Sequence, residues 1–296
     1  MLDILHNNDW ERPIYFTGGS YDDSEYFWMK DYLQLDGLVY KLVPIKTPID
    51  PNNPYQMGRI DTDIMYDIVM KWDWGNSDSK DIYHDPETRK NSISFRSNIN
   101  RLAETLIDEG QKEKAITVLD LAMEKMPIET FGYYSLVIPI AAAYYRAGAL
   151  DKAQKIVTTI ASGYEEYMRY YAQWNRDEQL MLMEDIVANV ERYKSLLTEI
   201  IKAKDLKSMT ALYDSFFESI MPFSYIYGKY DFYTQLTPFV AALYDSNQVE
   251  FARDLSTEIA QQYIDLLKRF LKLEDEQLSY FEMEIGIEIQ AYKSLV

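Results

Sequence analysis

The strongest constraint on the fold of this chain is a short pattern that occurs twice, 38 residues apart. Residues 99–127 and 134–162 each contain two apolar segments separated by a glycine. The matching positions are Ala103, Leu106, Gly110 and Ala115 in the first copy and Ala141, Tyr144, Gly148 and Ala153 in the second. Small residues let two helices approach closely, and glycine permits a tight turn between them. Each copy therefore predicts a helical hairpin, and we expect a mainly α chain.

The spacing of these hairpins is typical of tetratricopeptide repeats. A longer duplication aligns residues 131–145 with residues 230–244, which lie 99 positions later, and it carries Ala153 onto Ala252. At the same displacement, Asn247 replaces the turn glycine. We therefore expect a tetratricopeptide-like superhelix of helical hairpins in two halves.

The sequence pattern divides the chain into two parts. Residues 1–91 mix short β-prone runs with turn residues and predict a small mixed α/β segment, whereas residues 92–296 predict the α-solenoid. In the first part we expect strands at residues 14–17 and 37–44, helices at residues 24–35 and 61–72, and a loop over residues 74–91. In the second part we expect long helices at residues 164–204 between the two halves, and a capping helix at residues 274–294.

Charge and residue usage exclude several classes of function. The chain carries 30 Lys and Arg against 48 Asp and Glu, and its net charge of −18 repels nucleic acid and anionic membranes. It contains no cysteine, which excludes disulfides, thiolate nucleophiles and Cys-based metal sites. The two histidines, His6 and His84, are few for a metal hydrolase. We expect no cofactor, no metal and no nucleic-acid partner.

The sequence shows neither a membrane-spanning segment nor a secretory signal. Its longest uncharged runs, residues 131–145 and 232–244, are shorter than the roughly 18 apolar residues needed to cross a bilayer. Residues 1–9 have an early acid and no basic start. We expect that an exported location would require a segment upstream of Met1.

Common catalytic motifs do not occur in the sequence. We find no phosphate-binding glycine motif, no G-x-S-x-G elbow and no H-E-x-x-H segment. Neighbouring acids such as Glu165 and Glu166 could serve a glycosidase, which needs two carboxylates across a cleft. Acids at short spacing in residues 73–85 could hold calcium, but their order does not match an EF-hand, and we expect a solvated loop. We expect His84 to be exposed or paired with an acid, and no residue to be catalytic.

The abundance of aromatic residues points to a binding surface. The chain has 26 tyrosines, and a tyrosine offers sugar or peptide an apolar face with a polar edge. In a tetratricopeptide hairpin the first helix lines the concave surface. That geometry predicts a groove for a peptide segment or glycan, lined by Asn100, Glu104, Asp108, Tyr145, Arg146, Tyr244 and Asp245.

Two segments near the N-terminus carry a family resemblance. They are NNDWERPIYFT at residues 7–17 and YLQLDGLVYKLVP at residues 32–44, with shorter matches at residues 74–76, 82–85 and 143–148. The chain resembles the soluble C-terminal region of a bacterial family of polytopic membrane proteins of unknown function, whose membrane part resembles protein O-mannosyltransferases. The resemblance implies a periplasmic location and tethering to the inner membrane by an N-terminal region absent from this chain. It carries over no catalytic residue.

These observations predict a non-catalytic interaction module attached to a glycosyltransferase-like membrane protein. Its expected partner is an acceptor polypeptide or glycoprotein, or the upstream membrane part of the same protein, and it would meet the membrane only through the absent N-terminal region. The alternative is a soluble carbohydrate-active domain that uses paired carboxylates in an aromatic groove. A third possibility is a purely structural solenoid.

Overall fold

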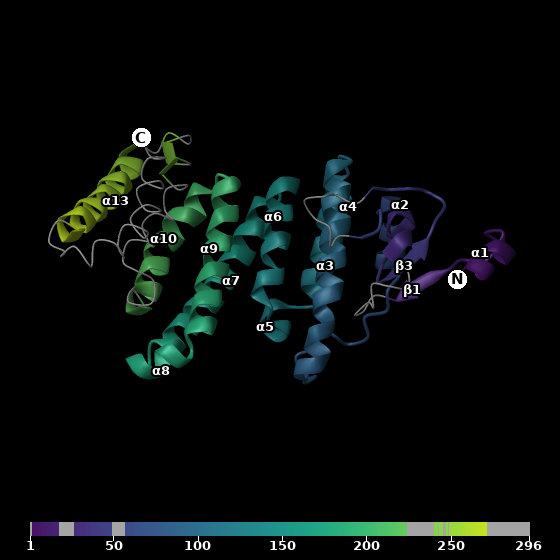
Figure 1. The fold of residues 1–296 in the computed structure, drawn as a ribbon, viewed down its shortest axis with the longest axis horizontal. Helices are drawn as coiled ribbons and strands as arrows, with labels where there is room; N and C mark the ends of the chain where they lie inside the picture. Colours follow the sequence, from purple (N-terminus) through teal and green to yellow (C-terminus); the bar gives the residue numbers. More distant parts are fainter. Residues whose placement is uncertain are drawn as a thin grey trace. The chain divides into compact units, whose positions relative to one another are not determined.

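The computed structural model describes residues 2–17, 27–48 and 57–223, and residues 240–270 apart from 242, 245, 246 and 248. The chain separates into two compact units, Met1–Ile156 and Val157–Val296. Helices dominate the described residues of both units, which confirms the mainly α class (Figure 1). Every helix among the described residues is too short or too polar to span a lipid bilayer.

A small antiparallel sheet follows the first helix, α1 (Leu2–Asn8). Its strands are β1 (Tyr15–Thr17), β2 (Leu33–Asp36) and β3 (Val39–Leu42), in the spatial order β1-β3-β2. Tyr15 lies opposite Lys41 in the pairing of the outer and central strands. The strands predicted within residues 14–17 and 37–44 are confirmed, as is the mixed character of this segment.

The helix predicted over residues 24–35 is wrong in its C-terminal part. The 3-10 helix η1 (Phe27–Tyr32) leads directly into β2, all of whose residues are buried. β2 turns into β3 at Gly37, whose φ of 70° lies in the left-handed region that favours glycine. An Asp-Gly pair between two apolar runs is a hairpin signal, and here it prevails over the helical spacing of the apolar residues.

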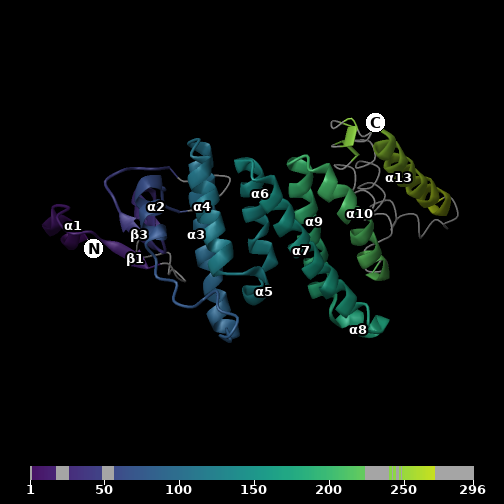
Figure 2. The same cartoon turned by 180° about the vertical axis from the view of Figure 1, so that it is seen from behind.

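Helices form the body of the first unit. They are α2 (Thr62–Met70), α3 (Pro86–Asp108), α4 (Lys112–Lys125), α5 (Ile128–Phe131), η2 (Tyr134–Leu136) and α6 (Ile138–Ala147). Figures 1 and 2 show the sheet and α2 on one side of the α3–α4 pair and α6 on the other. The helix predicted at residues 61–72 is confirmed as α2.

The start of α3 corrects the loop predicted over residues 74–91. Asp85 accepts hydrogen bonds from the backbone N–H groups of Glu87 and Thr88, and Pro86 fits the first helical position. The helix therefore begins within the predicted loop. The expected domain boundary between residues 91 and 92 falls inside α3, whereas the two compact units meet at residues 156 and 157.

The hairpins share one kind of turn. Its left-handed residues are Gly110 (φ 79°), Gly148 (φ 88°), Lys204 (φ 57°) and Asn247 (φ 61°). At the first three turns the N–H of the following residue bonds to a carbonyl five residues earlier, from Gln111 to Leu106 (2.7 Å), from Ala149 to Tyr144 (2.9 Å) and from Asp205 to Ile200 (3.1 Å). This is the Schellman arrangement that ends a helix. The turns predicted at the two glycines and at Asn247 are confirmed, and the turn at Lys204 is an addition.

The duplication over 99 residues is also present in the pattern of burial. The pairs buried in both copies are Ala141 and Val240, Tyr144 and Leu243, Ala153 and Ala252, Ile156 and Leu255, and Ile160 and Ile259. The second copy ends in α13 (Val249–Phe270), as the first ends in α7 (Leu150–Tyr171). The rest of its aromatic segment and the predicted cap at residues 274–294 lie outside the described residues.

The second unit has tyrosines in its core. Its other elements are α8 (Arg176–Met181), α9 (Met183–Lys202), α10 (Leu206–Ile220) and η3 (Met221–Phe223). The ring of Tyr193 lies 5.7 Å from that of Tyr164 and 4.9 Å from that of Phe216. Burial raises the pKa of Tyr193, whose hydroxyl donates a hydrogen bond to Glu165 at 2.9 Å.

Candidate functional site: an aromatic pocket beside α3

Five of the residues predicted to line a groove lie on α3 and α6. Asn100 is buried and donates a hydrogen bond to Glu104 at 3.1 Å. Asp108 and Arg146, which are 38 positions apart and so equivalent in the two hairpins, form an exposed ion pair. Tyr145 is half-buried next to Arg146. The structure therefore joins the first helices of two successive hairpins through polar residues from the predicted set.

The other two predicted residues belong to the second unit. Tyr244 is 47% exposed, and Asp245 lies outside the described residues. A groove shared by all seven residues stays a prediction.

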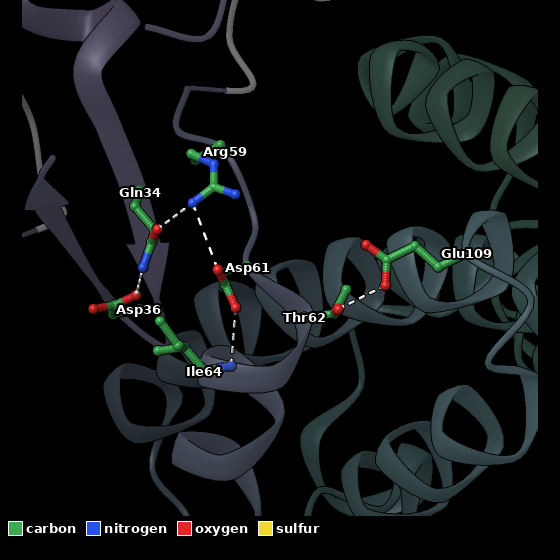
Figure 3. A network of polar contacts seen from close by, with 7 residues as sticks. All are labelled: Gln34, Asp36, Arg59, Asp61, Thr62, Ile64 and Glu109. Atoms are coloured by element: carbon green, nitrogen blue, oxygen red, sulfur yellow. Dashed lines mark hydrogen bonds and ion pairs between the residues drawn. The ribbon is translucent and has the colours of Figure 1, made fainter. Parts of the chain in front are cut away.

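A polar network organises the sheet and the start of α2. Figure 3 shows Arg59 donating a hydrogen bond to Gln34 at 2.6 Å, and Gln34 donating one to Asp36 at 2.9 Å. Arg59 also lies 3.6 Å from the carboxylate of Asp61, which accepts a hydrogen bond from the backbone N–H of Ile64. Gln34 and Asp36 are buried, so this network satisfies polar groups that would otherwise destabilise the sheet.

The sheet, residues 57–58 and the start of α2 are hydrogen-bonded to the α3–α4 hairpin. Thr62 donates to Glu109 at 2.6 Å (Figure 3), Asn98 donates to the carbonyl of Gly37 at 2.8 Å, and Arg101 donates to the carbonyls of Met57 and Gly58, both at 2.9 Å. These contacts bring the β2–β3 turn against α3, and the turn then forms part of a cavity.

The cavity, which we call the aromatic pocket, has a volume of about 280 Å³. The side-chain rings that line it belong to Trp72, Trp74, His84, Phe95 and Phe131. The ring centroids of Trp72, Trp74 and Phe95 lie 5.1 to 5.4 Å from one another. The His84 ring lies 4.8 Å from the Phe131 ring. Tilted and edge-to-face contacts of this kind hold the rings in fixed positions, so the pocket is preformed.

Most polar groups of the lining are bonded within the protein. Asp73 accepts from the N–H of Gly75 at 3.0 Å, Thr88 donates to Asp85 at 2.7 Å, and Ser92 donates to the carbonyl of Arg89 at 2.7 Å. Two groups differ. Asn91 is exposed, and the buried hydroxyl oxygen of Ser77 has no hydrogen-bond partner within the described part of the chain. The pocket therefore offers a ligand a large aromatic surface and few hydrogen-bonding groups.

The buried side chain of Arg96 positions one wall of the aromatic pocket. Its guanidinium donates hydrogen bonds to the carbonyls of Gly132 at 2.6 Å and Met126 at 2.8 Å. Its central carbon lies 5.9 Å from the centre of the Phe131 ring. Burial lowers the pKa of Arg96 to about 10, so the group is charged at neutral pH. Because Met126 and Phe131 both line the pocket, Arg96 fixes part of its shape.

In the acidic loop at residues 73–85, two carboxylates bond to other side chains of the protein. Asp78 forms an ion pair with Lys125 at 3.0 Å, and that hydrogen bond lowers the pKa of Asp78. The hydroxyl of Thr88 likewise lowers the pKa of Asp85. The prediction for His84 is corrected, because its ring is half-buried against Phe131 and its Nε2 lies 3.1 Å from a backbone carbonyl.

A second cavity, of about 300 Å³, lies in the second unit and has two acids, Glu165 and Glu218, in its lining. Counted over the described residues, its lining includes no aromatic side chain, whereas the aromatic pocket includes one carboxylate, that of Asp73. Paired acids and aromatic walls therefore belong to different cavities.

Residues 1–64 match the family model described as TMEM260-associated domain 2, which fits a domain tied to a membrane protein family. No curated protein and no solved structure matches the chain. The matched stretch contains the sheet and its polar network and ends within α2. The aromatic walls of the pocket follow it in the sequence.

Proposed function

We propose that this chain is a non-catalytic interaction module that recognises a polypeptide segment of an acceptor or partner protein. The observation that carries the proposal is the aromatic pocket, with its preformed ring walls and few available polar groups. Aromatic-lined grooves suit proline-rich or aliphatic peptide segments. A volume of about 280 Å³ accommodates one such side chain, and Asn91 can bond the adjoining peptide group.

The lining favours peptide over sugar. A sugar ring carries several hydroxyls, and each one buried without a hydrogen bond weakens binding. The hydroxyls of Thr88 and Ser92 already donate within the protein. A glycosidase needs two carboxylates across one site, and Asp73 is the one acid among the described lining residues.

We further propose that the module works in the periplasm as the tail of a glycosyltransferase-like membrane protein, tethered to the inner membrane through an upstream region. The match of residues 1–64 supports association with a membrane protein. The motifs at residues 7–17 and 32–44 support the glycosyltransferase-like character of that protein. In this setting the pocket would recognise acceptor polypeptide or glycoprotein.

Selection of short random peptides displayed on phage, with this chain as bait, tests the proposal. We expect enriched peptides to share a proline or aliphatic anchor. Synthetic versions should bind the unsubstituted chain about tenfold more tightly than Asn91→Leu, in which an apolar side chain occupies an exposed position of the pocket. Ser97→Leu is the matched control, because Ser97 is exposed on the same helix outside the lining, and its binding should not change.

Two outcomes would contradict the proposal. Peptides that bind Asn91→Leu as tightly as the unsubstituted chain would have their site elsewhere. Release of sugar from a panel of glycans, lost in Asp73→Asn, would instead favour the carbohydrate-active alternative.

A further inference from the structure

The corner between α7 and α9 exposes an unusual group of large apolar side chains. We call it the α8 corner. It consists of Tyr167 (44% exposed), Tyr170 (50%), Trp174 (39%), Leu180 (48%), Met181 (85%) and Met183 (43%). Both cartoon views show α8 at the end of the α7–α9 pair that is remote from the turn into α10 (Figures 1 and 2). A short segment that exposes six large apolar side chains is a candidate interaction surface.

Side chains of the turn between α7 and α8 bond to several of its backbone groups. The side-chain amide of the buried Gln179 donates to the carbonyls of Tyr171 at 3.1 Å and Trp174 at 2.9 Å. The side-chain oxygen of Asn175 accepts from the N–H groups of Asp177 at 3.0 Å and Glu178 at 3.1 Å. Peptide groups that enter lipid must be hydrogen-bonded within the protein, because lipid cannot replace the lost water. At this turn the bonds above satisfy two N–H groups and two carbonyls.

The residue types at the corner match a membrane interface. Tyrosine and tryptophan concentrate at the boundary between headgroups and acyl chains, where one end of the side chain stays wet. The Tyr170 ring lies 5.9 Å from the Trp174 ring in an edge-to-face contact, so the two aromatics form one cluster. Leu180 and Met181 supply purely apolar side chains that can lie deeper.

Charge decides which kind of membrane fits. Four acids, Asp177 and Glu178 at the start of α8 and Glu184 and Asp185 at the start of α9, flank the apolar side chains, against two basic residues, Arg169 in the last turn of α7 and Arg176 at the start of α8. The whole chain has a net charge of −18. Anionic lipid would therefore repel this surface, whereas zwitterionic lipid would not.

We propose that the α8 corner is a contact site for the surface of a zwitterionic bilayer, into which it inserts Trp174, Leu180 and Met181. The match of residues 1–64 to a domain tied to a membrane protein family is consistent with work beside a bilayer. This contact would be a second route to the membrane beside the upstream tether, which the sequence alone had given as the only one, and it is separate from the aromatic pocket. It would hold the second unit against the lipid surface.

Sedimentation of the full chain with phosphatidylcholine vesicles tests this inference. We expect binding to fall roughly tenfold in Met181→Ser and further in Leu180→Ser/Met181→Ser, since each change removes one buried apolar side chain. Tyr83→Ser is the matched control, because Tyr83 is 83% exposed in the other unit, and its binding should not change. Vesicles containing brominated lipid should quench the fluorescence of the unsubstituted chain but not that of Trp174→Phe.

Three results would overturn it. The first is an absence of binding to phosphatidylcholine vesicles. The second is stronger binding to vesicles that contain anionic lipid, which would indicate an electrostatic contact. The third is a concentration-dependent dimer abolished by Met181→Ser, which would make the corner an interface between copies of the chain.

Discussion

The guanidinium of Arg96 is buried, and backbone carbonyls are its hydrogen-bond acceptors at the end of α4 and after α5. A buried cation is unfavourable unless most of its donors are satisfied. Here the carbonyls of Gly132 and Met126 accept hydrogen bonds from the two terminal nitrogens of Arg96, whereas its Nε has no hydrogen-bond partner within the described residues. The same bonds hold the chain that carries Phe131. One side chain thus links core stability to the shape of the aromatic pocket.

Replacing Arg96 should therefore destabilise the first unit strongly. We expect Arg96→Ala to lower the free energy of unfolding by about 3 kcal/mol, because one buried and one partly buried carbonyl lose their donors and a cavity remains. Arg146→Ala is the control, because its ion pair with Asp108 is exposed and should contribute less than about 1 kcal/mol. Urea unfolding measures both. Equal losses in the two variants would contradict the role assigned to Arg96.

The buried side chain of Tyr144 leads to a prediction of how stability changes as the pH rises into the alkaline range. Its hydroxyl donates to Asp120 at 2.8 Å, and burial raises its pKa. An unfolded tyrosine loses its proton near pH 10, whereas the folded protein retains it, so this contribution to stability is complete below about pH 10 and is lost above it. The lowered pKa of Arg96 has the opposite effect on stability in the same pH range, because the folded protein gives up this proton more readily than the unfolded chain as the pH rises.

Comparison of Tyr144→Phe with the unsubstituted chain isolates the tyrosine, because Arg96 is present in both. We expect the substituted chain to lose stability less steeply above about pH 10, as measured by urea unfolding at a series of pH values. Identical slopes would show that Tyr144 ionises as freely in the folded state as in the unfolded state.

At the scale of helices and strands, the turns between paired helices place different residue types in the same left-handed conformation. This conformation is favourable for glycine and unfavourable for residues with a side chain. Gly148 adopts a φ of 88° without a side chain, whereas Lys204 adopts a φ of 57° with one. We expect Lys204→Gly to stabilise the second unit and Gly148→Ala to destabilise the first, each by about 1 kcal/mol. Thermal unfolding measures both changes. Destabilisation by Lys204→Gly would mean that the lysine side chain contributes more than the strain of its backbone.

The sequence predicted the helical hairpins because their signals are local. Ala103 and Ala115 repeat at Ala141 and Ala153, and all four are fully buried. The strand β2 was missed because Leu33, at its start, also fits a helical spacing with Phe27 and Met29, and the deciding Asp-Gly turn follows. The turn at Lys204 was missed because no glycine marks it.

The aromatic pocket was not predicted, since its walls meet only through tertiary contacts. Trp72 and Trp74 follow α2, Phe95 lies on α3, and Phe131 ends α5. The close spacing of the two tryptophans, ahead of an aromatic residue on a helix, was the available signal. Asp108 and Arg146 were predicted from the repeat as residues lining a groove, and the structure joins them in an ion pair.

At the scale of the whole molecule, the two units carry different surfaces. The aromatic pocket belongs to Met1–Ile156, and the α8 corner belongs to Val157–Val296. Asn91→Leu and Met181→Ser therefore alter one surface each. We expect peptide binding and vesicle binding to be lost independently in these two variants. Loss of both activities in either single variant would show that the surfaces are coupled.

The location of peptide binding is the central claim, and fluorine NMR of the chain labelled with 5-fluorotryptophan tests it most directly. The chain has five tryptophans, whose signals can be assigned from single Trp→Phe variants. Addition of a selected peptide should shift the signals of Trp72 and Trp74 and leave that of Trp174 unchanged. A bound peptide that shifts Trp174 alone, or none of the five, would contradict the assignment of the aromatic pocket as the recognition site.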